Sequence, residues 1–128
     1  MRFLMLIHDN PDRWEHPTFA QHDGIEQSEL AAMRQQFDDL IAELVESGEY
    51  VSGYSLAAPA LTRSVRVRGG NTTVSDGPHA AGTEQLAGYL VIDCESWERA
   101  EAIAARMPST RFAPIEIRPV MVHSGSEM

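Results

Sequence analysis

Residues 75–93 read SDGPHAAGTEQLAGYLVID, a short polar turn that runs into the most apolar segment in the second half of the chain. Gly77 tolerates a positive φ, and Pro78 fixes its own φ and restricts the residue before it. The turn is therefore predicted to form a rigid corner. That corner holds a carboxylate and an imidazole, Asp76 and His79, close together in the sequence.

This corner has two interpretations. In the first, the Asp76 carboxylate accepts hydrogen bonds from nearby backbone N–H groups, as aspartates in turns often do. In the second, Asp76 and His79 form an acid–base or ligand-binding corner at the mouth of a pocket. The residue types fit both interpretations, so both stay open.

Two segments are predicted to be central strands of a sheet. Residues 85–93 and residues 2–8 are apolar nearly throughout, which is typical of strands that are covered on both faces. In residues 2–8, Leu4 and Leu6 face away from Phe3, Met5 and Ile7. Helices on one side of a sheet leave its other side uncovered, so this second apolar face favours a dimer.

Residues 9–24 are rich in Asp, Pro, His and Gly, and we expect an irregular loop with about one helical turn. His16 and His22 lie in this loop. Their spacing, and the spacing to His8, matches no standard zinc pattern, and no cysteine supports one. We predict no metal site.

Residues 26–47 carry apolar side chains at helical spacing and predict a long helix. Asp23 and Glu26 have the spacing of a capping box at its start. Gly48 fits the left-handed position just past its end. The predicted buried stripe consists of Leu30, Met33, Phe37, Leu40, Ile41, Leu44 and Val45.

The middle of the chain predicts three more strands. Residues 50–57 form the first, in which Gly53 marks a bulge or a close approach of two backbones. Residues 63–68 and 72–75 pair as a hairpin around the Gly69–Gly70 turn.

A second helix is predicted between Ser96, its N-terminal cap, and Pro108, which stops it. Residues 115–122 form the last strand, and residues 123–128 are expected to be a frayed tail. The buried stripe of this helix is predicted to be Ala100, Ile103, Ala104 and Met107.

The order of elements, β-α-β-β-β-β-α-β, is typical of an α+β fold of the ferredoxin-like kind with one inserted hairpin. The two helices are expected to cover one face of an antiparallel sheet. Residues 1–122 are expected to form a single domain, because 128 residues suffice for one core.

Composition excludes several classes of function. The net charge is −9, and all ten basic residues are arginines, which argues against direct binding to nucleic acid or to anionic membranes. The single cysteine, Cys94, excludes an intrachain disulfide and fits a reducing compartment. No secretory signal or membrane span is evident, so we expect a cytoplasmic protein. No phosphate-binding loop or nucleophile elbow is present, and no cofactor is predicted.

Three separated segments resemble the YCII-related family, in its DGPF-domain branch. They are the MRFLMLIH opening, the DGPH turn with its EQLAGYLVID strand, and the IEIRPVM closing segment. His79 stands where that branch has Phe. The resemblance implies a dimeric α/β barrel, in which two sheets pack face to face.

The resemblance also bears on the site. Some members of the wider family carry a His–Asp pair suggested as an acid–base dyad, with the histidine on the first helix, and residues 26–47 contain no histidine. Asp76 is carried over through its Asp-Gly-Pro turn, and His79 is a hypothetical substitute for the missing imidazole. The candidate ligand-binding residues are His8, Tyr54, Glu116 and Arg118.

Two classes of function remain open. The first is a domain that binds or acts on a small molecule in a pocket between the sheet and a dimer partner, with Asp76 as the acid–base group. The second is a non-catalytic regulatory module. DGPF-type proteins resemble partners of extracytoplasmic-function sigma factors, and an acidic surface suits a basic protein partner. The substrate, the pathway and catalysis itself are not encoded in any motif of the sequence.

Overall fold

The computed structural model describes residues 1–10 and 13–128; Pro11 and Asp12, within the predicted 9–24 loop, lie outside the described residues. The strands are β1 (Arg2–Asp9), β2 (Tyr50–Ser55), β3 (Arg63–Arg68), β4 (Asn71–Asp76), β5 (Gln85–Asp93) and β6 (Ile115–Pro119). The helices are α1 (Gln27–Ser47) and α2 (Trp97–Ala105). Three 3₁₀ turns lie in connections: η1 (Thr18–Gln21) before α1, η2 (Pro59–Leu61) between β2 and β3, and η3 (Pro108–Arg111) between α2 and β6.

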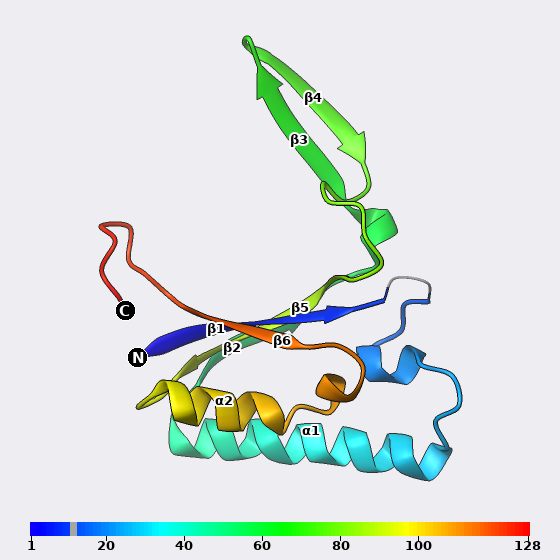
Figure 1. Cartoon of the computed structure of the whole chain (residues 1–128), viewed down its shortest axis with the longest axis vertical. Helices are drawn as coiled ribbons and strands as arrows, with labels where there is room; N and C mark the ends of the chain where they lie inside the picture. The colour runs from blue at the N-terminus through cyan, green and yellow to red at the C-terminus, as the bar shows by residue number, and fades with distance from the viewer. Residues whose placement is uncertain (11–12) are drawn as a thin grey trace.

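Four strands form one antiparallel sheet in the order β2-β5-β1-β6, and β3 and β4 form a separate two-stranded hairpin. Both helices lie against the same face of the sheet (Figure 1). The predicted α+β class, with two helices on one face of an antiparallel sheet, is confirmed. The strand order is consistent with a ferredoxin-like fold that carries an inserted hairpin. Among the described residues, no helix has the length and hydropathy to cross a lipid bilayer.

The core lies between the sheet and the two helices. Phe3 and Met5 on β1, Leu40 and Leu44 on α1, and Ile103 on α2 are completely buried. Each such side chain stabilises the fold by about 2 kcal/mol through removal of apolar area from water. The predicted stripe of α2 is buried throughout.

The predicted burial is wrong for one residue of the α1 stripe. Val45 is 59% exposed, whereas its neighbour Leu44 is completely buried. Adjacent helical positions lie 100° apart, so both cannot point at one narrow core.

The helix ends differ from the prediction at one of three places. Gly48 adopts φ 81° and donates its N–H to the Val45 carbonyl, as the left-handed cap requires. The Ser96 hydroxyl accepts the Arg99 N–H at 3.1 Å. The capping box is wrong, because Glu26 caps α1 without a side-chain hydrogen bond. The Asp23 carboxylate instead accepts a hydrogen bond from Arg13 at 2.7 Å.

Two glycines let β2 and β5 approach closely. A Cβ on Gly53 would lie 3.1 Å from Leu90 Cδ1, and a Cβ on Gly88 would lie 2.8 Å from the Tyr54 carbonyl oxygen. The predicted close approach at Gly53 is confirmed.

The last strand is shorter than predicted. Strand β6 ends at Pro119, which has no N–H for the ladder. The chain then reverses, and Met121 forms a β-bridge with Glu127. The Met128 N–H donates to the Val120 carbonyl at 2.9 Å, so residues 123–128 fold back instead of fraying.

Candidate functional site

The face of the sheet opposite the helices carries all four predicted ligand-binding residues. The register pairs Tyr54 with Tyr89, Tyr89 with Leu6, and Leu6 with Glu116, which places these side chains in one row across all four strands. We call this surface the open face. Its side chains are Leu4, Leu6, His8, Tyr54, Tyr89, Val91, Glu116 and Arg118.

Two predicted residues on the open face meet. His8 Nε2 lies 3.7 Å from Glu116 Oε1, and the His8 side chain is 22% exposed. Arg118 follows Glu116 on the same face of β6 and is exposed. Tyr54 lies on β2, at the edge of the sheet opposite β6. Three inter-strand spacings, about 14 Å, separate it from Glu116. The structure therefore brings His8 and Glu116 together. Arg118 lies opposite Leu4, four residues from His8 along β1, and Tyr54 lies at the other edge of the sheet.

Asp76 and His79 lie elsewhere, at the root of the β3–β4 hairpin, and both are exposed. The corner itself forms as predicted: Gly77 has φ 93°, its N–H donates to the Thr62 carbonyl, and its carbonyl accepts from the Ser64 hydroxyl at 2.8 Å. Within the described parts of the chain, the Asp76 carboxylate has no hydrogen bond or ion pair, so it does not satisfy the local backbone.

The His79 ring is held from the hairpin. Its Nδ1 accepts a hydrogen bond from Arg66 Nη2 at 3.0 Å, which requires an unprotonated Nδ1. His79 lines a hollow of about 560 Å³ at the hairpin root, and Asp76 is absent from its lining. Asp76 and His79 are therefore close in the sequence but make no contact with each other in the described structure.

A smaller cavity of about 280 Å³ lies at the β2 edge of the sheet, where residues of α1, β2 and β5 line it. Its wall is largely apolar and includes one predicted site residue, Tyr54. Ser109 also lines it; this residue is 6% exposed, and its Oγ has no hydrogen-bond partner in the described structure. The apolar lining includes Ile7, Phe19, Phe37, Ile41, Leu90 and Met107.

The structure pairs two residues that sequence reasoning did not connect. Asp9, at the end of β1, is 1% exposed, and its Oδ1 lies 2.8 Å from His22 Nε2. The same oxygen accepts the Asn10 N–H at 2.8 Å. The His22 ring stacks on Phe112 with centroids 3.9 Å apart and planes inclined by 9°. A carboxylate and a stacked ring therefore fix the orientation of this imidazole.

Unsatisfied acceptors occur in this pair and in the two 3₁₀ turns η1 and η3. Asp9 Oδ2, Gln21 Oε1 and Ser109 Oγ are buried and have no hydrogen-bond partner among the described residues. They come from the end of β1, from η1 and from η3, and the two 3₁₀ turns contact each other. A buried acceptor without a donor costs free energy, so a cluster of them indicates a site that a polar group completes.

A signal for Asp9 was present in the sequence. Residues on one face of a strand alternate, so Asp9 shares the buried face of β1 with Phe3, Met5 and Ile7. The apolar run of residues 2–8 predicts a strand that ends at His8 and leaves Asp9 to the following loop, whereas β1 extends to Asp9. Extending the alternation by one residue would have placed a carboxylate on the buried face.

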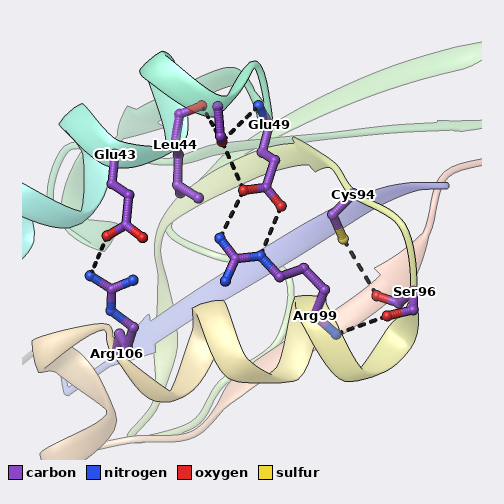
Figure 2. A network of polar contacts seen from close by, with 8 residues as sticks. Glu43, Leu44, Glu49, Cys94, Ser96, Arg99 and Arg106 are labelled. Carbon is purple, nitrogen blue, oxygen red and sulfur yellow. Dashed lines mark hydrogen bonds and ion pairs between the residues drawn. The ribbon is translucent and has the colours of Figure 1, made fainter.

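A further polar network has a structural role (Figure 2). Arg99 donates two hydrogen bonds to Glu49, and these bonds lower the pKa of the Glu49 carboxyl to about 2 against the opposing effect of burial. Arg106 likewise lowers the pKa of Glu43. Burial raises the pKa of the Cys94 thiol. In the described part of the chain, no group of three or more His, Cys, Asp or Glu residues is placed to hold a metal ion.

The comparisons with known proteins identify the family. The model of the YCII-related domain matches residues 1–124, so the chain belongs to the YCII-related family. An uncharacterized protein of Rhizobium meliloti (strain 1021) is 33% identical over 88 residues, which cover 66% of this chain and 69% of that protein.

One solved structure is similar over nearly the whole chain. It is the 5-chloro-2-hydroxyhydroquinone dehydrochlorinase TftG from Burkholderia phenoliruptrix AC1100, in complex with 2,5-dihydroxybenzoquinone. The match covers 98% of this chain and 100% of that chain, with a TM-score of 0.44 and 15% sequence identity.

Proposed function

We propose that this domain binds, and transfers a proton to or from, a small and largely apolar molecule in the cavity beside β2. The observation that carries this proposal is the Asp9–His22 pair. A buried carboxylate orients the imidazole and keeps one oxygen unsatisfied. Neither residue lines the cavity, but His22 directly follows η1, whose Thr18 and Phe19 do, and the lining contains an unsatisfied hydroxyl, Ser109 Oγ.

The pair has the chemistry of an acid–base group. When His22 Nε2–H donates to Asp9, the other ring nitrogen, Nδ1, carries the lone pair. The carboxylate then stabilises the imidazolium that forms when Nδ1 takes a proton. This tautomer follows from the hydrogen bond with Asp9.

The cavity favours a particular class of ligand. Its volume of about 280 Å³ is near the lower end for small-molecule sites, which suits a molecule of one ring. Its apolar wall favours an apolar body. The unpaired hydroxyl of Ser109, which belongs to the lining, favours a ligand that carries a hydrogen-bonding group.

A ligand-dependent melting screen tests the proposal. A ligand at 100 times its Kd adds about 2.7 kcal/mol to the free energy of unfolding, a shift of several degrees for a domain of this size. We expect small hydroxylated rings to shift the melting temperature of the wild type and of the control His123→Gln, whose residue is exposed. The shift should disappear in His22→Gln.

The same screen with Asp76→Ala separates the two candidate acid–base groups. If the ligand-induced shift in melting temperature is lost in Asp76→Ala and kept in His22→Gln, the acid–base role belongs to Asp76. No shift with any compound of this class, in protein that melts cooperatively, would refute the small-molecule proposal.

We further propose that the chain is a homodimer of the DGPF branch, with two open faces packed against each other as in a dimeric α/β barrel. Leu4, Leu6 and Val91 form an apolar strip there that is only half-buried. A partner would enclose His8, Glu116 and Arg118 as a polar site within the interface. Light scattering that gives the monomer mass would contradict this. The alternative, a partner of an extracytoplasmic-function sigma factor, has no support in the relatives described above.

A further inference from the structure

The β3–β4 hairpin stands away from the rest of the molecule (Figure 1). Every residue from Arg63 to Asp76 is exposed except Ser64, which is half-buried. The hairpin joins the body at its root, where the Gly77 N–H donates to the Thr62 carbonyl. A two-stranded hairpin alone is at best marginally stable in water, so this one needs a surface to pack on.

One face of the hairpin is apolar beyond the Arg63–Asp76 pair at its root. The register pairs Val65 with Val74 and Val67 with Thr72, so all four side chains share one side. The three valines are 63%, 57% and 66% exposed at positions 65, 74 and 67, respectively. We call this surface the valine face. The opposite face carries Ser64, Arg66, Arg68, Asn71, Thr73 and Ser75.

The hairpin and the body have opposite charge. Residues 63–76 contain three arginines and one aspartate, a net charge of +2. The rest of the chain contains the other seven of ten basic residues and the other eighteen of nineteen acidic residues, a net charge of −11. The basic hairpin therefore attracts the acidic body of another copy of the same chain at long range, although Arg66 and Arg68 lie on the face opposite the valines.

The direction in which the hairpin extends also favours a second copy of the chain as its partner. In Figure 1 the helices lie on one side of the sheet, and the hairpin extends on the other side, toward which the open face is directed. A second copy packed on the open face would lie alongside it.

We propose that the hairpin is an arm that packs its valine face against the body of a second copy docked on the open face. This inference rests on the homodimer proposed above. The two arms of a symmetric dimer would each cover the other copy, and each would bury three valines that the single chain leaves in water.

The arm is tested by measuring the dimer dissociation constant by sedimentation velocity over a dilution series. In Val65→Thr/Val67→Thr/Val74→Thr, each side chain keeps its branched shape and strand preference but loses apolar surface. We expect dimerisation to weaken by at least about tenfold, and the control Thr73→Ser/Ser75→Thr, on the opposite face, to match the wild type. In Arg66→Gln/Arg68→Gln, the dependence of dimerisation on salt should become shallower.

Hydrogen exchange gives a second readout and reports on folding of the variants. Amides of residues 63–76 should be protected in the dimer and should lose protection on dilution, while amides of β1 and β5 stay protected in every variant. The arm proposal is refuted if the triple variant dimerises like the wild type and the hairpin amides are unprotected in every sample. That result would not contradict the homodimer proposal. A wild type that is monomeric refutes both the arm proposal and the homodimer proposal. The melting screen tests the ligand proposal independently of this result.

Discussion

Arg99 on α2 holds the carboxylate of Glu49 with two hydrogen bonds, from Nε to Oε2 at 2.9 Å and from Nη2 to Oε1 at 2.8 Å. Glu49 lies in the connection between α1 and β2, so the pair ties the end of one helix to the start of the other (Figure 2). The Glu49 side chain is 16% exposed and also accepts from the Ser47 hydroxyl at 2.8 Å. This pair and the buried core lead to four predictions.

The first concerns stability in acid. Folding lowers the pKa of Glu49 from 4.5 to about 2, so the ionised form is the one that stabilises the fold. Its contribution is complete above pH 4.5 and is lost as the pH falls toward 2. Glu49→Gln should lower the free energy of unfolding by about 1.5–3 kcal/mol at neutral pH, measured by urea unfolding. The difference from the wild type should shrink in acid. Glu46→Gln is the control, and an equal loss there would contradict the prediction.

The second concerns the close approach of β2 and β5. Gly88→Ala places a Cβ 2.8 Å from the backbone oxygen of Tyr54, which cannot move without disturbing the ladder. We expect a loss of about 1–3 kcal/mol in the free energy of unfolding. Gly82→Ala, where the nearest atom is 3.9 Å away, should change it by less than about 0.5 kcal/mol. Equal effects in the two variants would show that β2 and β5 do not pack as described.

The third concerns the single cysteine. Cys94 is 6% exposed, its Sγ donates to the Ser96 carbonyl at 3.4 Å, and burial raises the pKa of the thiol. Because the thiolate is the reactive form, iodoacetamide should modify the folded protein far more slowly than the urea-unfolded protein at the same pH. Rapid modification of the folded protein would place this thiol at the surface.

The fourth concerns the α1 interface. Leu40→Ala removes a completely buried side chain and should cost about 2–5 kcal/mol in thermal or urea unfolding. Val45→Ala, at a position 59% exposed on the same helix, should have little effect or stabilise slightly, because alanine favours helix. A large loss in Val45→Ala would indicate that a partner covers that side of α1.

Local patterns predicted the fold well because most elements here follow local rules. Alternation over residues 2–8 and 85–93 predicted the two central strands, and the Gly69–Gly70 pair predicted the hairpin. The errors came where tertiary context decides. Asp23 and Glu26 have capping-box spacing, but Arg13 takes the Asp23 carboxylate.

The candidate site was harder to predict, because it depends on residues that only the fold brings together. Asp9 and His22 are thirteen residues apart, and Phe112, which stacks on His22, is ninety residues further along the chain. Glu116 meets His8 because β6 pairs with β1, an adjacency that periodicity does not specify. The spacing rules that excluded a zinc site carry no information about a buried carboxylate that orients a histidine.

The central position of β1 has a consequence for synthesis of the protein. This strand is synthesised before the other strands of its sheet, yet both of its neighbours, β5 and β6, lie more than 70 residues further along the chain. At 5–20 residues per second, the interval between the ends of β1 and β5 is on the order of 4–17 s. Throughout that time an apolar segment has no strand to pair with. The nascent chain should therefore depend on holding chaperones until β5 has been synthesised, and yield in cells should follow their supply.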